Sequence, residues 1–184
     1  MDSFESVIAG MLRRQGYWVW PRFKVLLTKE EKKAIGRPSS PRWEIDLVGY
    51  RGSTNEVLAM ECKSFLNSTG VTLDSVTNSK SDTRYKLFRE PILWDTVSQR
   101  LVSQLVQSGA CAPDPIVRLG LATGHIRNGR DRLLLKEHFE SRGWILWDDH
   151  DVARQLRELK TSGYEDEIDA VVAKLIDVGI EVAP

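Results

Sequence analysis

The first 27 residues carry apolar positions at two different spacings, first helical and then alternating. Positions 4, 7, 8, 11 and 12 form one apolar stripe of a helix over about residues 3–15, and Gly16 can end it. Residues 17–27 (YWVWPRFKVLL) are β-branched and aromatic with alternating stretches, which predicts a strand. Because Pro21 cannot donate a hydrogen bond to a central ladder, we expect this strand at a sheet edge or in a bulge.

Two further strands follow a polar stretch. Residues 28–41 are charged and then rich in Gly, Pro and Ser, which predicts a loop that joins a hairpin. WEIDLVGY (43–50) and EVLAMECKSF (56–65) are separated by a polar turn, RGSTN, so we expect them to pair antiparallel. The segment 66–84 is rich in Ser, Thr and Asn without helical periodicity. It predicts a long flexible loop of the kind that can close over a substrate.

The second half of the chain alternates helices and strands. The expected elements are a long amphipathic helix ending at Gly109 (86–109), a strand (116–123), a helix (131–143), a strand (144–148), a helix (151–160) and a last amphipathic helix (165–178). This order predicts an α/β fold with a central mixed sheet of about four to five strands, helices on its faces and an extra C-terminal helix. We expect a single domain over 1–184, with its core at about 3–160.

Composition is that of an ordinary globular protein. Hydrophobic residues make up 41% of the chain and charged residues 28%, which argues against disorder. The two cysteines, Cys62 and Cys111, are too few for a disulfide framework and form no Cys-x-x-Cys pair. At the amino terminus acids precede a short apolar run and arginines follow it, the reverse of a secretory signal. With no stretch near the roughly 20 apolar residues of a membrane span, we expect a cytoplasmic protein without a membrane partner.

The net charge is zero, but it is unevenly distributed along the chain. Residues 1–100 hold 16 Lys and Arg against 12 Asp and Glu, whereas residues 101–184 hold 10 against 14. The basic amino-terminal half is compatible with a nucleic-acid partner, although its excess is far below that of a dedicated binder.

An acid and a lysine at the spacing E-x-K occur four times, so the spacing alone is not informative. The four pairs are Glu30/Lys32, Glu31/Lys33, Glu61/Lys63 and Glu158/Lys160. Two of them lie in a charged segment and one on the polar side of a helix, where a solvated face is the simple interpretation. Glu61 and Lys63 alone interrupt an apolar strand pattern, which makes them the candidates for chemistry.

Strand alternation predicts which side chains accompany Glu61 and Lys63. Residues two apart share a face, so Glu61 and Lys63 lie on the face of Val57 and Ala59. The opposite face holds Leu58, Met60 and Cys62. The same rule places Glu44 and Asp46 on one face of the preceding strand, opposite its apolar residues. Antiparallel pairing through the short turn can therefore bring three carboxylates and a lysine together.

Carboxylates gathered in this way repel one another, and burying them without partners is costly. A hard divalent cation resolves the conflict, because Mg²⁺ prefers oxygen ligands and is commonly held by one or two carboxylates together with a substrate phosphate. Lys63 would then orient or deprotonate an attacking water, or stabilise negative charge at phosphorus. The competing interpretation is a structural cluster of ion pairs at a sheet edge.

With this pattern the chain resembles the PD-(D/E)xK nuclease superfamily, which has the restriction-endonuclease-like fold with an αβββαβ core. The resemblance covers about residues 3–160. Asp46 matches the lone aspartate of the second core strand, and Glu61 with Lys63 matches the E-x-K of the third. The carbonyl after the motif glutamate, here that of Cys62, is commonly a metal ligand in such nucleases. Glu5 matches an acid often found on their first helix.

The superfamily resemblance implies a hydrolase that cuts phosphodiester bonds, most often in DNA, with Mg²⁺ or with Mn²⁺ in its place. The segment GWILWDDHDVARQL also resembles the late strand and helix of the Mrr-like and Holliday-resolvase-like branches. One departure from the common pattern is Ile45, which stands before Asp46 where many members have proline. RNA is an open alternative substrate, and one site per chain makes a homodimer plausible for double-strand cutting.

Several other side chains are further candidates for the same site, each with an alternative role. Glu44 is either an additional metal ligand beside Asp46 or the partner of an arginine. Glu5 is a possible metal ligand, yet Asp2 with Glu5 also reads as a helix capping box. Candidate nucleic-acid contacts are four residues on the long helix and at the end of the polar loop: Arg100, Gln104, Lys80 and Arg84.

Aromatic and imidazole side chains offer two further possibilities. Trp18 and Trp20, with the cations of the same strand, Arg22 and Lys24, either stack on bases or mark a packed strand. His125 precedes a loop that can touch phosphate, but no histidine has zinc-ligand spacing. Two alternatives to a nuclease stay open: a catalytically inactive module that binds nucleic acid or a protein partner, and a structural domain with an ion-pair network.

Overall fold

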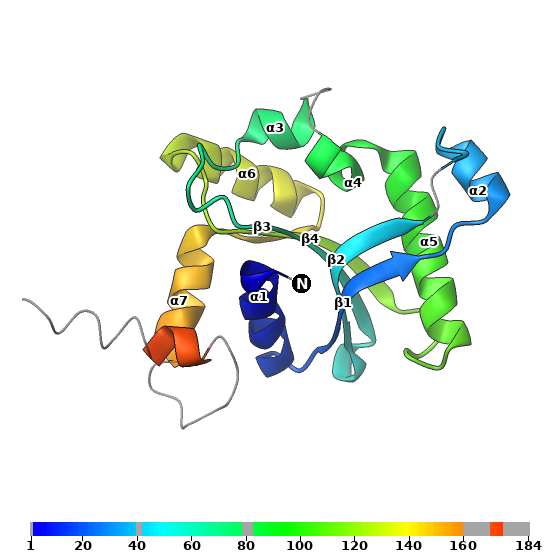
Figure 1. Ribbon diagram of the computed structural model, residues 1–184, viewed down its shortest axis with the longest axis horizontal. Helices are drawn as coiled ribbons and strands as arrows, with labels where there is room; N and C mark the ends of the chain where they lie inside the picture. Colours follow the sequence, from blue (N-terminus) through cyan, green and yellow to red (C-terminus); the bar gives the residue numbers. More distant parts are fainter. Residues whose placement is uncertain (1, 40–41, 79–82, 160–169, 175–184) are drawn as a thin grey trace, which may run out of the picture.

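The computed structural model describes residues 2–39, 42–78, 83–159 and 170–174, whose centre is one mixed sheet (Figure 1). Its strands follow one another in space as they do in sequence: β1 (Trp18–Val25), β2 (Trp43–Arg51), β3 (Glu56–Lys63), β4 (Ile116–Thr123) and β5 (Ile145–Trp147). β1, β2 and β3 pair antiparallel, whereas β3, β4 and β5 pair parallel. The predicted α/β class, the αβββαβ order and the mixed sheet, here with five strands, are confirmed.

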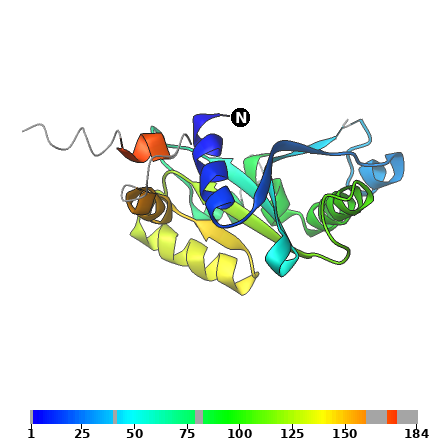
Figure 2. The ribbon, with the colours of Figure 1, turned by 90° about the horizontal axis from the view of Figure 1, so that it is seen from below.

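Helices cover both faces of this sheet. They are α1 (Ser3–Arg14), α2 (Lys29–Ala34), α3 (Leu73–Thr77), α4 (Lys86–Arg89), α5 (Pro91–Gln107), α6 (Gly129–Ser141) and α7 (Asp149–Leu159), with short 3₁₀ turns at Gly52–Thr54 and Thr83–Tyr85. α1 and α7 lie on one side of the sheet and α3 to α6 on the other, as the view from below also shows (Figure 2). Residues 170–174 are helical too, as expected for a C-terminal helix. Among the described helices, none is both long and apolar enough to cross a membrane.

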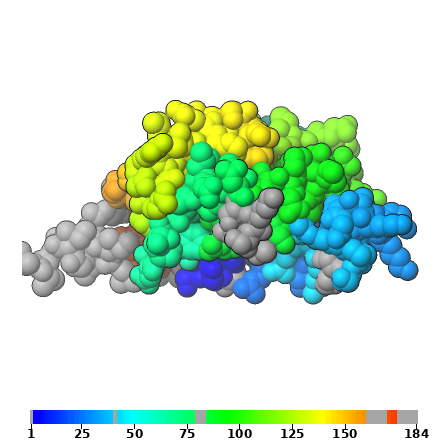
Figure 3. All heavy atoms as spheres, turned by 90° about the horizontal axis from the view of Figure 1, so that it is seen from above, coloured from blue at the N-terminus to red at the C-terminus, as the bar shows by residue number. Residues whose placement is uncertain are grey.

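Two apolar clusters fill the space between the sheet and these helices. The first holds Val57 and Ala59 of β3 with residues of α4, α5 and α6, and the second holds Leu58, Met60 and Cys62 with residues of α1. β3 is buried along nearly its whole length, which explains the apolar run at residues 57–60. Seen from above, the segments from α3 to α6 make up most of the face that is in view (Figure 3).

Three expectations about connecting segments are wrong in detail. The stretch 28–41 contains α2, and 66–84 contains α3. Each short helix begins with a capping box, at Thr28 and at Thr72, where local side-chain bonds replace the apolar periodicity that we sought. The helix expected over 86–109 is split into α4 and α5 at Pro91, because proline disfavours helical backbone at the residue before it. The last helix, expected over 165–178, lies outside the described residues except at 170–174.

A matched kink interrupts alternation in β1 and β2. Trp20 and Phe23, three residues apart on β1, both pack on the first cluster, although three-residue spacing places strand side chains on opposite faces. Ile45 and Val48 of β2 do the same. Arg22 has the positive backbone angle φ 49°. Of the two expectations for Pro21, the edge position is confirmed, because β1 is the first strand of the sheet. The register between β1 and β2 is the same on both sides of Arg22 and Asp46, so the two strands share a kink and neither contains the extra residue of a bulge.

Candidate functional site

The kink in β2 lies where this strand leaves β3. The β2–β3 ladder runs from Arg51 and Glu56 to Leu47 and Met60, and the next residue on β2 is Asp46. At this point a side chain replaces the backbone as the acceptor on β2, because Asp46 Oδ2 accepts a hydrogen bond of 2.7 Å from the backbone N–H of Cys62. A carboxylate is thus fixed in the fork between two strands by the backbone of the neighbouring strand.

Lys63 connects the two acids of the predicted motif. Its Nζ lies 3.1 Å from Asp46 Oδ2 and 3.2 Å from Glu61 Oε2. The exposed fractions of the three side chains are 16% for Lys63, 25% for Asp46 and 12% for Glu61. The structure therefore brings together the three residues that sequence patterning selected, at a site that solvent reaches only in part.

Electrostatics at this site oppose full ionisation of Glu61. The pKa of Glu61 is raised to about 7, chiefly by burial; the Lys63 ammonium opposes this increase, and the Asp46 and Glu5 carboxylates add to it. Burial by itself lowers the pKa of Lys63, but the carboxylates of Glu61 and Asp46 outweigh it and hold that pKa well above its ordinary value. Lys63 is thus a persistent cation, and the site carries negative charge that this one ammonium does not fully compensate.

Glu5 reaches the same electrostatic environment from α1. It is 8% exposed, and burial raises its pKa, with further contributions from Asp2 and Asp46 that have the same sign. Glu5 also closes the capping box at the start of α1, because its Oε2 accepts a hydrogen bond from the Asp2 N–H at 3.1 Å. Both interpretations of Glu5 are therefore compatible with its position: it caps α1 and it adds charge to the field around Asp46.

The loops that follow β3 and β4 cross just beyond Lys63. The backbone N–H of Gly124 donates to the Lys63 carbonyl at 3.0 Å, and a Cβ on Gly124 would overlap the carbonyl oxygen of Ser64. Phe65 then adopts φ 44°, and the Arg84 guanidinium lies 4.9 Å from its ring centre. Of the basic residues predicted to contact nucleic acid, Arg84 is therefore anchored on the segment that leaves the site.

The other predicted basic and amide contacts are engaged away from the acids. Arg100 Nε pairs with Glu31 of α2 at 3.1 Å. The Gln104 side chain bonds the backbone of β1 and of the residue that follows it, accepting from the Leu26 N–H and donating to the Lys24 carbonyl. Lys80 lies outside the described residues. Arg100 and Gln104 thus bind α5 to α2 and to the end of β1.

Glu44 does not join Asp46 on one face of β2. It is exposed, and its partner across the β1–β2 ladder is Lys24. The expectation of a common face assumed uninterrupted alternation, whereas Ile45 and Leu47, on either side of Asp46, pack in different apolar clusters. The kink turns Asp46 into the fork and leaves Glu44 beyond it.

The donor set suits a hard cation with few protein ligands. Within the described parts of the chain, no group of three or more His, Cys, Asp or Glu side chains is arranged to hold a metal ion. The carboxylates of Asp46 and Glu61, which share one ammonium, offer two sets of oxygen atoms, and the Cys62 carbonyl directly follows Glu61 in the sequence. Mg²⁺ is commonly held by one or two carboxylates and retains several waters, so these residues fit it.

The remaining candidate side chains lie on β1 and shortly after β4. Arg22, which we grouped with the aromatic residues of β1, has its Nε 4.0 Å from Glu5 Oε2. The break in alternation at Pro21 was the signal that could have singled it out. Trp18 is 76% exposed, whereas Trp20 packs on the first cluster. His125 has its Nδ1 4.0 Å from Asp149 Oδ2, at the start of α7.

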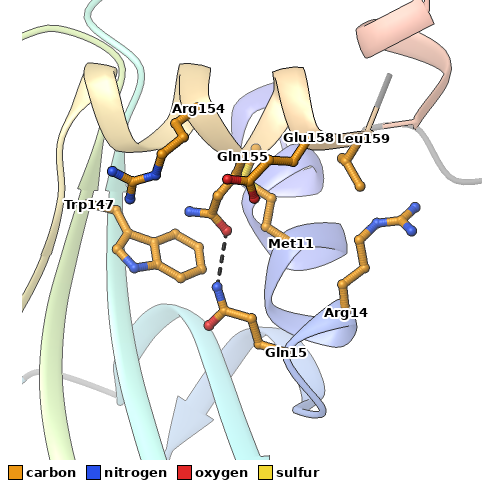
Figure 4. A pocket seen from close by; sticks show the side chains of 8 residues that line it. All are labelled: Met11, Arg14, Gln15, Trp147, Arg154, Gln155, Glu158 and Leu159. Carbon is orange, nitrogen blue, oxygen red and sulfur yellow. Dashed lines mark hydrogen bonds between the residues drawn. The ribbon is translucent and has the colours of Figure 1, made fainter. Parts of the chain in front are cut away.

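A separate hollow of about 410 Å³ lies between α1 and α7 (Figure 4). Its lining comes from both helices, from the residue after α1 and from β5: Met11, Arg14, Gln15, Trp147, Arg154, Gln155, Glu158 and Leu159. Gln15 Nε2 donates to Gln155 Oε1 at 3.0 Å across it. The lining includes none of the three motif residues, so this hollow is distinct from the acidic fork.

Comparison with known proteins adds little to this description. No family model matches the chain, and no curated protein matches it. A crystal structure of a protein of unknown function, AF1548, aligns with a TM-score of 0.47 and 13% sequence identity, covering 97% of this chain and 78% of that chain. A similarity this distant carries no argument about fold or function.

Proposed function

We propose that this protein is a metal-dependent nuclease that hydrolyses phosphodiester bonds, with DNA as its substrate. The observation that carries the proposal is the contact of one partly buried lysine, Lys63, with two carboxylates, from Asp46 and Glu61, in the fork between β2 and β3. The resemblance of these residues to the PD-(D/E)xK motif and the αβββαβ order of the elements support it.

Asp46 and Glu61 would hold the cation, with the Cys62 carbonyl as an additional ligand and Glu5 close enough to influence the charge. A bound Mg²⁺ or Mn²⁺ would polarise a phosphoryl oxygen and make a bound water more acidic. The raised pKa of Glu61 fits this role, because a divalent cation would stabilise the charged carboxylate that burial, and to a smaller extent the neighbouring acids, disfavour.

Lys63 would act as a fixed positive charge. Because neighbouring carboxylates keep its pKa high, Lys63 is suited to stabilising negative charge that develops on the phosphoryl group, and not to removing a proton. The Asp46 bond to the Cys62 N–H holds one of the two carboxylates that position the ammonium. Such preorganised charge is a large contribution to many enzyme rates.

A screen of nucleic-acid forms tests the proposal. Wild-type protein is incubated with linear, supercoiled, single-stranded and branched DNA and with RNA, in Mg²⁺, in Mn²⁺ and in EDTA. Lys63→Ala is the test variant, and Lys33→Ala is its matched control, since Lys33 belongs to another E-x-K pair and is exposed on α2. We expect metal-dependent cleavage by the wild type and the control alone. Absence of cleavage of every form in both metals would contradict the proposal.

A catalytically inactive module that binds nucleic acid or a protein partner is the second candidate. It is favoured by one observation: Lys63 forms ion pairs with both carboxylates, those of Asp46 and Glu61, so the cluster has a cation partner without a metal. Salt-dependent DNA binding without cleavage in either metal, and without metal affinity, would select this candidate.

A further inference from the structure

Arg22 stands at a special position beside the acidic fork. The β1–β2 ladder pairs Pro21 with Leu47 and Phe23 with Ile45, which leaves Arg22 opposite Asp46 without a paired contact. The Arg22 Nε atom lies 4.0 Å from Glu5 Oε2, and 56% of its side chain is exposed. We propose that Arg22 binds a backbone phosphate of the substrate strand next to the two carboxylates. This inference rests on the proposed nuclease function and deepens it.

The backbone of Arg22 supports a functional role. Arg22 is one of four described non-glycine residues with a positive φ, the others being Asn55, Phe65 and Asp114. Such a conformation costs about 1 kcal/mol or more for a side chain of this size, and costly backbone of this kind gathers at binding and catalytic sites. Asn55 ends a turn between strands, where asparagine adopts this conformation readily. Arg22 instead lies inside a strand, where the kink serves no turn.

Charge gives the second argument. Asp46, Glu61 and Glu5 together repel a polyanionic substrate, so a phosphate can approach only where a cation offsets them. Lys63 is shielded and bonded to two of these carboxylates. Arg22 is more exposed, and its guanidinium can donate two parallel hydrogen bonds to phosphate oxygens. It is therefore a cation that an incoming strand can meet at the edge of the fork.

A purely structural role predicts different behaviour. If the kink alone matters, any residue that keeps φ near 49° preserves function, and glycine adopts this angle without strain. Arg22→Gly thus removes the guanidinium and keeps the backbone. Arg22→Lys keeps the charge and removes the paired donors. Arg154→Ala is the control, because Arg154 is similarly exposed, at 60%, and pairs with an acid, Asp151, in the α7 helix.

The experiment combines these variants with chemically altered substrates. Wild type, Arg22→Gly, Arg22→Lys and Arg154→Ala are assayed on oligonucleotides in which one phosphate at a time is replaced by an uncharged methylphosphonate. We expect Arg22→Gly to lose about 10- to 100-fold in kcat/KM, Arg22→Lys to lose less, and Arg154→Ala to match wild type. One methylphosphonate position should slow the wild type by a similar factor and have no further effect on Arg22→Gly.

Each other outcome contradicts the inference. If Arg22→Gly has wild-type activity, the assignment of Arg22 to a phosphate is wrong while the nuclease proposal stands. The same conclusion follows if each methylphosphonate lowers kcat/KM by the same factor in Arg22→Gly as in wild type. If the wild type cleaves nothing, the nuclease proposal fails first, and binding of the same oligonucleotides in Ca²⁺ then decides about Arg22. The quantity measured is the slope of the logarithm of the binding constant against the logarithm of the salt concentration. If Arg22 contacts a phosphate, Arg22→Gly should make this slope shallower by about one, and an unchanged slope rejects the contact.

Discussion

The Asp46 carboxylate accepts a 2.7 Å hydrogen bond from the backbone N–H of Cys62, in place of a ladder bond between β2 and β3. This contact joins the two strands at the point where they separate. It also fixes the position of an acid whose Oδ2 is 3.1 Å from Lys63 Nζ. One side chain therefore stabilises the fork and organises the charges that we assign to catalysis.

The first prediction separates these two roles of Asp46. Asp46→Ala leaves the buried Cys62 N–H without its acceptor and should lower the free energy of unfolding by about 1–3 kcal/mol. Asp46→Asn keeps an oxygen that can accept this bond and should unfold within about 1 kcal/mol of wild type, yet lose metal affinity. Urea unfolding and Mg²⁺ calorimetry on both variants measure the two effects.

Glu44→Gln is the control for Asp46, because Glu44 is exposed and faces Lys24. It should change neither stability nor metal affinity measurably. Loss of metal affinity in Glu44→Gln, or full metal affinity in Asp46→Asn, would show that our assignment of the acids is wrong.

The alternation of side chains along the sequence predicted the pair Glu61 and Lys63, because it depends only on the local geometry of one strand. β3 is regular, so the pattern placed Glu61 and Lys63 correctly relative to each other and to the buried Cys62 between them. On β2 the same rule fails at Asp46, because a kink shared with β1 shifts the faces. The position of Asp46 beside Lys63 depends on where two strands diverge, which is a tertiary property.

Connections and long side chains were harder to predict. The capping boxes of α2 and α3 each depend on two polar residues, Thr28 with Glu31 and Thr72 with Ser75. Helices this short show no apolar period. Arg100 and Gln104 lie on the helix where we expected substrate contacts, but their partners are Glu31 and the backbone around β1. Which polar group such a side chain meets is decided by elements far away in sequence.

The second prediction concerns pH and Glu61. Burial raises its pKa from 4.5 to about 7 in the folded protein, so the folded state holds this proton more tightly than the unfolded chain does. The stability that the protonated carboxyl contributes is complete below about pH 4.5 and is lost as the pH rises to about 7. Without metal, Glu61→Gln should therefore be more stable than wild type at pH 8, by roughly 2 kcal/mol, but not at pH 4.

Added Mg²⁺ should reverse this order at pH 8, because the cation stabilises the folded wild type and finds one carboxylate fewer in Glu61→Gln. Thermal unfolding at the two pH values, with Mg²⁺ and with EDTA, provides the measurement. A stability difference that is independent of pH and of metal would contradict the assignment of Glu61.

The third prediction distinguishes the two roles of Glu5. Glutamine at the third helical position can still accept from the Asp2 N–H, so Glu5→Gln should keep the capping box and unfold within about 0.5 kcal/mol of wild type. If Glu5 contributes to the cation site, the same change should weaken Mg²⁺ affinity by about 10-fold. Calorimetry decides between the roles, and unchanged affinity would leave Glu5 as a helix cap alone.

The most direct test of the central claim is the single-turnover rate of phosphodiester cleavage by wild type and Lys63→Ala. It is measured in Mg²⁺ on the nucleic acid that the wild type cleaves best, with circular dichroism to verify that both proteins are folded. Because Lys63 is the charge that we assign to the transition state, its removal should lower the rate by about 100- to 1000-fold. Equal rates for the two folded proteins would contradict the account.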